Sequence, residues 1–435
     1  MGSIKVNSFD VKIWNKTRLA LWLMWVCPAI CFGQYSNAYN EAQSMLNEKN
    51  YFKARDYIMD HGNELSPAEN LIMKANVASA FNQPGASNKA LKLFWQRYLK
   101  GAPDTVRLEL LKLRQNNYAR LFEYAEAYKI SQQLLSKYSK HLSPADYADI
   151  SNTAVIWKSL AGCPKQHISI TGDTFIKMKR DRAKLANIAV QSNETAADFI
   201  FDTGANFCTV TESTAKAFNM RRLKGKVEIG AVTGAKVLSG LAICPVFSMG
   251  NVMVKNAVFL VLPDTALAFP QIKYQINGII GFPVIEGLKE IQILRNDELI
   301  VPKRASSSAL KNMALEFLTP IYQINDEYYT FDTGATNTML YRKYLEKHKN
   351  EILEENLLQD LKFGGAGGAV TKKGYKINFR TVISGKTIDL KNVEVFSNYI
   401  NDSKDHFYGN IGQDLIKEFD KMTINFRRCS FYLNK

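Results

Sequence analysis

The sequence predicts a multidomain protein with an α-helical N-terminal domain followed by an all-β, two-lobed domain. From residue 38 to about 160, apolar residues recur at spacings of three and four, as in amphipathic helices. From about residue 166, apolar and polar residues alternate, which indicates half-buried strands. One short motif then occurs twice, which indicates a duplicated lobe. With 435 residues, 46% of them hydrophobic, the chain can form two or three folded cores.

Residues 1–33 have the layout of a secretory signal peptide. Residues 1–18 are polar with several positive charges, and residues 19–32 are almost entirely apolar. Gly33 is a small residue suited to cleavage, which would leave Gln34 as the mature start. We therefore expect an exported, secreted protein in the periplasm or outside the cell. The apolar run is short for a membrane-spanning helix of about 20 residues, and an uncleaved membrane anchor is the alternative.

Residues 34–162 are predicted to form the helical domain. Proline-containing breaks separate its helices at Ser66-Pro67, Gln83-Pro84-Gly85, Gly101-Ala102-Pro103 and Ser143-Pro144. Ser66 and Ser143 are expected N-caps, each before a proline at the first helical position. Paired helices of this length resemble tetratricopeptide-like repeats, a resemblance that implies a surface for a protein partner or a substrate. A plain helical bundle without a concave groove is the alternative.

The repeated motif is Phe201-Asp202-Thr203-Gly204-Ala205, which recurs as Phe331-Asp332-Thr333-Gly334-Ala335. Each copy follows an apolar, strand-like run. A single Asp-Thr-Gly can be a simple turn in which the aspartate caps its own backbone. A second feature repeats as well, because Ile279-Ile280-Gly281 follows the first copy and Asn410-Ile411-Gly412 follows the second. A duplicated lobe explains both repeats.

These motifs resemble those of retropepsin-like aspartic proteases, here as a bacterial exported type with both lobes fused in one chain. The family has Asp-Thr-Gly-Ala, then a flap hairpin, then two apolar residues before a glycine; Asn410 stands where an aliphatic residue is usual. The resemblance implies an aspartic endopeptidase that uses no cofactor and no metal ion. Its catalytic residues would be Asp202 and Asp332, which activate a water molecule. Such a pair shares one proton, and the sequence leaves open which aspartate carries it.

The resemblance also implies supporting roles for the other residues of the two loops. They are Thr203, Gly204, Ala205, Thr333, Gly334 and Ala335. The threonine hydroxyls would brace the loops against each other, and the glycines would let backbone N–H groups approach the carboxylates. The alanines lack a hydroxyl that could donate to a carboxylate and favour its ionised form. We therefore expect a dyad that works at mildly acidic to neutral pH.

Two glycine-rich hairpins, within residues 226–238 and 363–369, are candidate flaps. The residues expected to contact substrate are Val232, Thr233 and Gly234 in the first hairpin and Gly365, Ala366 and Gly367 in the second. Glycine permits close approach of the backbone to an extended peptide, so we expect the polypeptide substrate to bind as an extended strand. Either hairpin alone could also be a simple turn.

The composition shifts place the domain boundaries. We expect a signal peptide at 1–33, the helical domain at 34–162, the first protease lobe at 163–300, an interlobe linker at 301–312 and the second protease lobe at 313–435. The linker is predicted because residues 301–308 are mostly small or polar and lack periodicity.

The formal net charge of +15 is interpreted as a solvated basic surface. The basic residues are spread along the chain and no RNA-binding motif accompanies them, so no nucleic acid partner is expected, and a membrane contact only through an uncleaved anchor. The six cysteines form no Cys-x-x-Cys pair, and the five histidines have no ligand spacing, which makes a zinc site improbable. In an oxidising compartment one or two disulfides could form among the four cysteines beyond residue 33.

Two alternatives compete with the endopeptidase. One is a non-catalytic peptide- or protein-binding module, in which helical repeats work with a protease-like platform. The other is a protein that cleaves mainly its own chain, near residues 306–308 or near Gly162. Two intact aspartates favour an enzyme, since a binding platform has no need for two carboxylates that repel each other.

Overall fold

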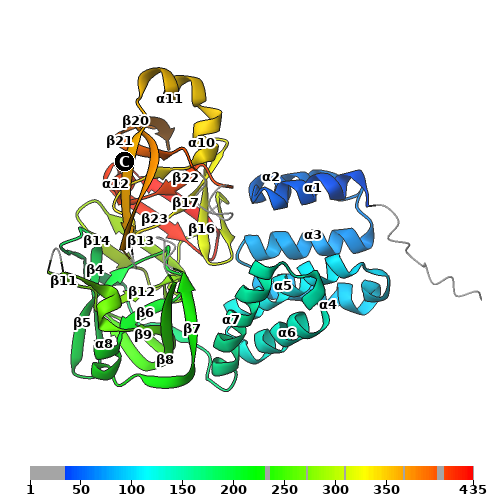
Figure 1. The fold of residues 1–435 in the computed structure, drawn as a ribbon, viewed down its shortest axis with the longest axis horizontal. Helices are drawn as coiled ribbons and strands as arrows, with labels where there is room; N and C mark the ends of the chain where they lie inside the picture. Colours follow the sequence, from blue (N-terminus) through cyan, green and yellow to red (C-terminus); the bar gives the residue numbers. More distant parts are fainter. Residues whose placement is uncertain are drawn as a thin grey trace, which may run out of the picture.

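The computed structural model describes residues 35–230, 236–270, 273–307, 310–365, 368–398 and 406–434. Its helical N-terminal part and its β-rich remainder confirm the predicted fold class, and Figure 1 shows the helices packed beside the β part. The predicted signal peptide, residues 1–33, lies outside the described residues. Within the described ranges, no helix is both long and apolar enough to cross a membrane.

Seven α-helices occupy residues 35–160. They are α1 (Asn37–Asn47), α2 (Tyr51–His61), α3 (Pro67–Ala80), α4 (Pro84–Tyr98), α5 (Asp104–Arg120), α6 (Tyr124–Lys137) and α7 (Pro144–Leu160), with 3₁₀ turns η1 (Leu99–Gly101) and η2 (Ser139–His141). The side chains of Ser66 and Ser143 each accept a backbone N–H, and a proline follows each as the first helical residue. Successive helices contact one another. Because a plain bundle would show such contacts too, the tetratricopeptide-like repeat stays a prediction.

The first lobe is a β-structure with two short helices. Its elements are β1 (His167–Ile170), β2 (Thr174–Lys177), β3 (Lys179–Arg180), β4 (Ala186–Ser192), β5 (Thr195–Phe201), β6 (Cys208–Thr211), α8 (Glu212–Ala217), β7 (Arg221–Gly230), β8 (Lys236–Met249), β9 (Val252–Leu262), η3 (Asp264–Leu267), β10 (Ala268–Phe269), β11 (Tyr274–Gln275), β12 (Gly278–Ile280), α9 (Phe282–Gly287), β13 (Glu290–Leu294) and β14 (Glu298–Val301). The main sheet has the order β1-β9-β6-β12-β5-β4-β8-β7. Strand β12 runs parallel to β5 and antiparallel to β6.

The second lobe repeats this arrangement. Its elements are β15 (Met313–Glu316), β16 (Thr319–Ile324), β17 (Glu327–Phe331), β18 (Met339–Leu340), α10 (Arg342–Lys347), α11 (Lys349–Glu355), β19 (Gln359–Gly365), β20 (Gly368–Ile383), β21 (Lys386–Phe396), β22 (Gly409–Ile411) and α12 (Gln413–Lys417). The sheet order is β15-β16-β17-β22-β18-β21-β20-β19. Strand β22 runs parallel to β17 and antiparallel to β18, so it corresponds to β12 of the first lobe.

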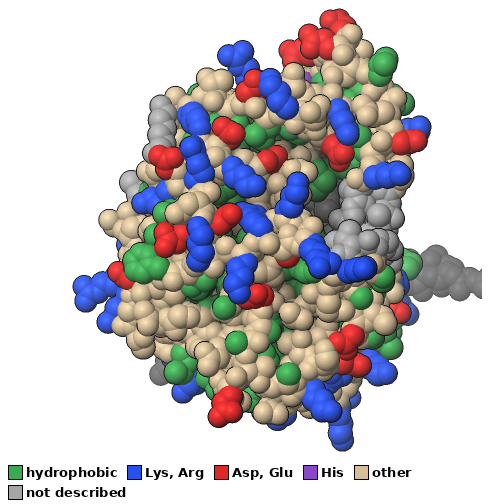
Figure 2. Space-filling view, turned by 90° about the vertical axis from the view of Figure 1, so that its left-hand side faces the viewer, with side chains coloured by type: hydrophobic (Ala, Val, Ile, Leu, Met, Phe, Trp, Pro, Cys, Tyr) green, Lys and Arg blue, Asp and Glu red, His purple; other side chains and the backbone are tan. Residues whose placement is uncertain are grey.

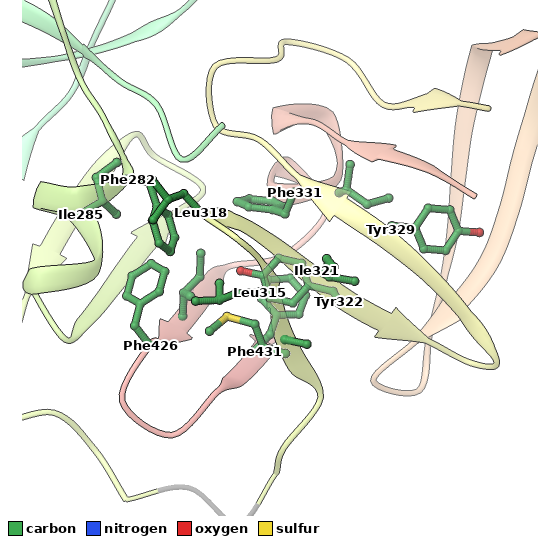
Figure 3. Packing of buried hydrophobic residues seen from close by; sticks show 14 of the residues in the cluster. Phe282, Ile285, Leu315, Leu318, Ile321, Tyr322, Tyr329, Phe331, Phe426 and Phe431 are labelled. Atoms are coloured by element: carbon green, nitrogen blue, oxygen red, sulfur yellow. The ribbon is translucent and has the colours of Figure 1, made fainter. Parts of the chain in front are cut away.

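A shared sheet joins the two lobes. Strands β2, β14 and β13 of the first lobe continue into β23 (Lys421–Asn425) and β24 (Ser430–Asn434) of the second, with β13 and β23 antiparallel. Apolar side chains from both lobes pack together beside this sheet (Figure 3), among them Phe282 and Phe426, whose rings lie 5.7 Å apart edge to face. Such packing of rings from both lobes fixes how the lobes sit against each other.

The predicted interlobe linker is partly anchored. Its first residue, Val301, ends β14. Ser306 donates its backbone N–H and its hydroxyl to the buried carboxylate of Glu290, at 2.7 and 2.6 Å. Asn425 on β23 donates to the same carboxylate oxygen at 2.9 Å. A buried carboxylate needs such partners, so Glu290 holds the linker against the shared sheet.

The helical domain packs on the first lobe through α7. Trp157, 4% exposed, stacks on Tyr124 of α6 and lies 6.3 Å from the ring of Phe207, just after the first aspartate loop. Asn152 hydrogen-bonds both backbone groups of Glu228 on the edge strand β7, at 2.7 and 2.9 Å. The helices thus cover an edge that would otherwise present unpaired backbone groups.

Free thiols are found at all four cysteines of the described ranges. Cys208, Cys244 and Cys429 are buried and Cys163 is half-buried. The one or two disulfides that the sequence allows are therefore absent from this part of the chain. Cys208, 1% exposed, behaves as a small core residue.

Candidate active site

Each candidate catalytic aspartate stands directly after a central strand of its lobe. Asp202 follows β5, and its backbone N–H donates to the carbonyl of Ile280 on β12 at 3.0 Å. Asp332 follows β17, and its N–H donates to Ile411 on β22, also at 3.0 Å. The neighbouring parallel strand therefore fixes the start of each aspartate loop in the same way in both lobes.

The two loops meet across the lobe boundary. The carboxyl group of each aspartate lies against the glycine of the opposite loop. An ideal Cβ on Gly204 would lie 2.6 Å from Cγ of Asp332, and one on Gly334 would lie 2.6 Å from Cγ of Asp202. Any side chain at either position would push the carboxyl groups apart, so glycine is required here for close approach.

Both aspartates are half-buried, so their carboxyl groups combine a low-polarity setting with access from outside. Asp202 accepts the N–H groups of Gly204 and Ala205 at 2.8 and 3.0 Å, and Asp332 accepts that of Gly334 at 2.7 Å. Loss of water contact, followed by the charge of Asp332, nevertheless raises the pKa of Asp202 well above the ordinary range. The pair therefore keeps a proton to higher pH than a solvated aspartate would.

The two motif threonines form a reciprocal network beneath the carboxyl groups. The Thr333 hydroxyl accepts the N–H of Thr203 at 3.0 Å and donates to the carbonyl of Phe201 at 2.6 Å. The Thr203 hydroxyl accepts the N–H of Thr333 at 3.0 Å and donates to the carbonyl of Phe331 at 3.3 Å. Both threonines are at most 2% exposed. Buried hydrogen bonds of this kind hold the loops in one geometry.

The alanines of the two loops accept hydrogen bonds from the first residues of α9 and α12. The carbonyl of Ala205 accepts the N–H of Phe282 at 2.8 Å, and that of Ala335 accepts the N–H of Gln413 at 2.9 Å. The side chain of Gln413 also donates to the carbonyl of Thr333. The sequence reasoning missed Gln413, although its place directly after the second Ile-Gly pair could have indicated it.

Cys208 and Thr338 are a second equivalent pair that the sequence reasoning did not single out as supporting residues. Gly281 donates its N–H to the sulfur of Cys208 at 3.3 Å, and Gly412 donates its N–H to the hydroxyl of Thr338 at 3.2 Å. Burial raises the pKa of the Cys208 thiol to about 12, so it remains a thiol at neutral pH. Its role is thus to support the loop and not to act as a nucleophile.

The candidate flap residues are only partly within the described ranges. Val232, Thr233 and Gly234 lie outside them, as do Ala366 and Gly367. The strands that lead to both tips are present, with Gly230 paired to Lys236 in the first hairpin and Gly365 paired to Gly368 in the second. Both candidate flaps are therefore extended antiparallel hairpins up to their tips.

Asn410, the departure from the family motif, has a polar partner. It is 6% exposed, and its Oδ1 accepts the hydroxyl of Thr330 at 2.7 Å. In the first lobe the corresponding pair is Ile279 and Ile200. A polar pair thus replaces an apolar pair at equivalent places.

Among the residues that the structure describes, the charged groups outside the dyad form no candidate metal site. Within the described ranges, no group of three or more His, Cys, Asp or Glu side chains could hold a metal ion. On the face in Figure 2, Lys and Arg side chains are scattered among acidic ones and do not gather in one patch.

One comparison with known proteins matches a family to part of the first lobe. The model of an aspartyl protease family matches residues 188–284, which include Asp202, Gly281 and the strands leading to the first flap. No curated protein matches the chain. Among solved structures, the chain is similar to a retropepsin-like aspartic protease from Rickettsia conorii, with 18% sequence identity over 32% of this chain and 94% of that chain and a TM-score of 0.21. The first lobe thus carries the sequence pattern of an aspartyl protease.

Proposed function

We propose that the protein is an exported aspartic endopeptidase whose dyad is Asp202 and Asp332. The observation that carries the proposal is the close approach of two carboxyl groups from equivalent loops 130 residues apart, each of which lies against the glycine of the opposite loop. Each carboxyl group is also held by its own loop's backbone N–H groups. Two carboxyl groups at this separation cannot both ionise easily, which provides an acid and a base in one site.

In the proposed reaction, the ionised carboxylate takes a proton from a water molecule while the water oxygen attacks the carbonyl carbon of the scissile peptide bond. The protonated carboxyl group donates a hydrogen bond to the carbonyl oxygen, where negative charge develops. The peptide nitrogen then takes a proton from the dyad as the C–N bond breaks, and a carboxylic acid and an amine are released. The substrate would lie as an extended strand beneath the two hairpins.

The helical domain is proposed to bind a protein partner or to guide the substrate. Its α7 contacts β7, the strand that leads to the first hairpin tip, through Asn152 and Glu228. Export to the periplasm or the cell exterior is proposed from residues 1–33, which have the layout of a signal peptide. This segment would either be cleaved off or remain as a membrane anchor. Fractionation of cells that express the full chain tests that part separately.

The central test compares four purified proteins on a mixed peptide library between pH 4 and 8. They are the wild type, Asp202→Asn, Asp332→Asn and the control Asp198→Asn, which makes the same change on β5 at an aspartate paired with Lys179 on the surface. We expect cleavage by the wild type and the control and none by either dyad variant. Equal cleavage by all four would refute the assignment. Peptide binding without cleavage by the wild type would favour the non-catalytic platform instead.

A further inference from the structure

The aspartates stand on the same side of the central strands as the residue two positions before them. Side chains alternate along a strand. On β5, Phe199 and Phe201 belong to the main core, whereas Ile200 points to the opposite face, the face of Asp202. On β17, Thr330 precedes Asp332 by two positions, as Ile200 precedes Asp202, and it pairs with the neighbouring parallel strand in the same way. Thr330 therefore lies at the place equivalent to Ile200, on the face of Asp332.

The neighbouring parallel strand adds a second residue to this face in each lobe. Ile279 on β12 is in register with Ile200, and Asn410 on β22 is in register with Thr330. Their next residues, Ile280 and Ile411, both belong to the main core. Each half of the cleft therefore has two side chains beside its aspartate, an isoleucine pair in the first lobe and a Thr-Asn pair in the second.

The isoleucine pair belongs to an apolar cluster that reaches the first hairpin. It packs in one cluster with Leu267 and with Ile229 and Val237, which are paired across β7 and β8 near the hairpin tip. An apolar side chain of a bound peptide that packs against this cluster would be removed from water. This half of the cleft is therefore suited to an apolar side chain of the substrate.

The Thr-Asn pair has unused hydrogen-bonding capacity. The Thr330 hydroxyl lies 2.7 Å from Oδ1 of Asn410 and 3.3 Å from the carbonyl of Gly409. The Nδ2 group of Asn410 has no hydrogen-bond partner among the residues that the structure describes and keeps some contact with water, although Asn410 is only 6% exposed. A peptide side chain in the cleft could replace that water contact with a hydrogen bond.

We propose that Thr330 and Asn410 form a polar subsite in the second-lobe half of the cleft, which selects a neutral side chain with an amide or hydroxyl group: Asn, Gln, Ser or Thr. This deepens the proposed function and rests on it. The preferred substrate then has an apolar residue on one side of the scissile bond and a neutral polar residue on the other. An acidic side chain is disfavoured because the dyad already carries a negative charge.

The test measures kcat/KM on peptides in which the two residues flanking the scissile bond vary. For the wild type, we expect Gln or Asn to exceed Leu by about three- to tenfold at one flanking position only, as one neutral hydrogen bond would give. The double variant Thr330→Ile/Asn410→Ile copies the first-lobe pair and should reverse the preference at that position alone. Thr423→Ile, which alters a threonine of the same 7% exposure in the shared sheet, should leave the profile unchanged.

Several outcomes would overturn the polar subsite. They are a wild type that prefers apolar residues on both sides, a double variant with the wild-type profile, or a reversal caused by Thr423→Ile. The single variant Asn410→Leu, which keeps the branching at Cγ, serves if the double variant does not fold. Binding of the same peptides to Asp202→Asn gives a readout independent of turnover. A loss of preference there overturns the subsite, whereas peptides that the wild type binds selectively but does not cleave would overturn only the proposed hydrolysis.

Discussion

Replacing Asp202 by asparagine should change the pH dependence of stability in a defined direction. An asparagine has nearly the shape of a protonated aspartic acid, so it can still accept the N–H groups of Gly204 and Ala205 and donate to Asp332. It cannot become charged. The variant therefore removes one titration and retains most of the contacts.

The sign follows from the raised pKa of Asp202. Below the pKa of an unfolded aspartate, about 3.9, the group is protonated in both states and adds no pH dependence. Above it, the unfolded chain loses the proton while the folded chain keeps it, so wild-type stability falls as pH rises up to the folded pKa. The loss is about 1.4 kcal/mol for each pH unit between the two pKa values.

The measurement is urea unfolding of the wild type and Asp202→Asn at pH values from 4 to 8. The variant should gain stability relative to the wild type as pH rises and then level off. Asp198→Asn, the surface control on the same strand, should follow the wild type throughout. A difference between Asp202→Asn and the wild type that is the same at pH 4 and pH 8 would refute the account of a dyad that holds a proton.

Three further changes test the scaffold. Thr333→Val leaves two buried backbone groups without partners, so the free energy of unfolding should fall by about 2–6 kcal/mol in a urea titration. Thr333→Ser keeps the hydroxyl group and should retain most of the wild-type stability. Gly204→Ala places a methyl group against Asp332 and should lower kcat/KM by more than tenfold with little change in KM; full activity would contradict the packing. Trp157→Ala should lower the free energy of unfolding by about 3–5 kcal/mol and destabilise the first lobe together with the helices. Hydrogen exchange of the backbone around Phe207 measures the effect on the first lobe. Unchanged exchange there would contradict a core shared by the two parts.

Local patterns in the sequence account for much of this structure. The helix starts at Pro67 and Pro144 follow from serine caps and proline, which act within one turn. The duplicated lobe follows from two copies of one motif and of the Ile-Gly step, and both copies fold into the same strand arrangement. The common conformation of the two aspartate loops could be predicted because each loop is formed by a strand, a turn and a neighbouring strand of the same lobe.

What the tertiary structure decided is how distant segments meet. The sequence could not show that Gln413 donates a hydrogen bond to Thr333, that Ser306 donates to Glu290, or that Asn152 donates to the backbone of β7. Each of these contacts joins separate elements, and the spacing of such elements along the chain does not indicate whether they meet. The absence of disulfides in the described ranges was undetermined for the same reason.

The sequence by itself determined the two carboxylates, the glycines beside them and the order of helical and β parts, because composition and period fix local conformation. Only the tertiary structure placed Asp202 against Asp332, since the shared sheet sets how the lobes sit together. It also set Ile200 and Thr330 at equivalent places beside the dyad. That comparison depends on strand register, which long-range pairing decides.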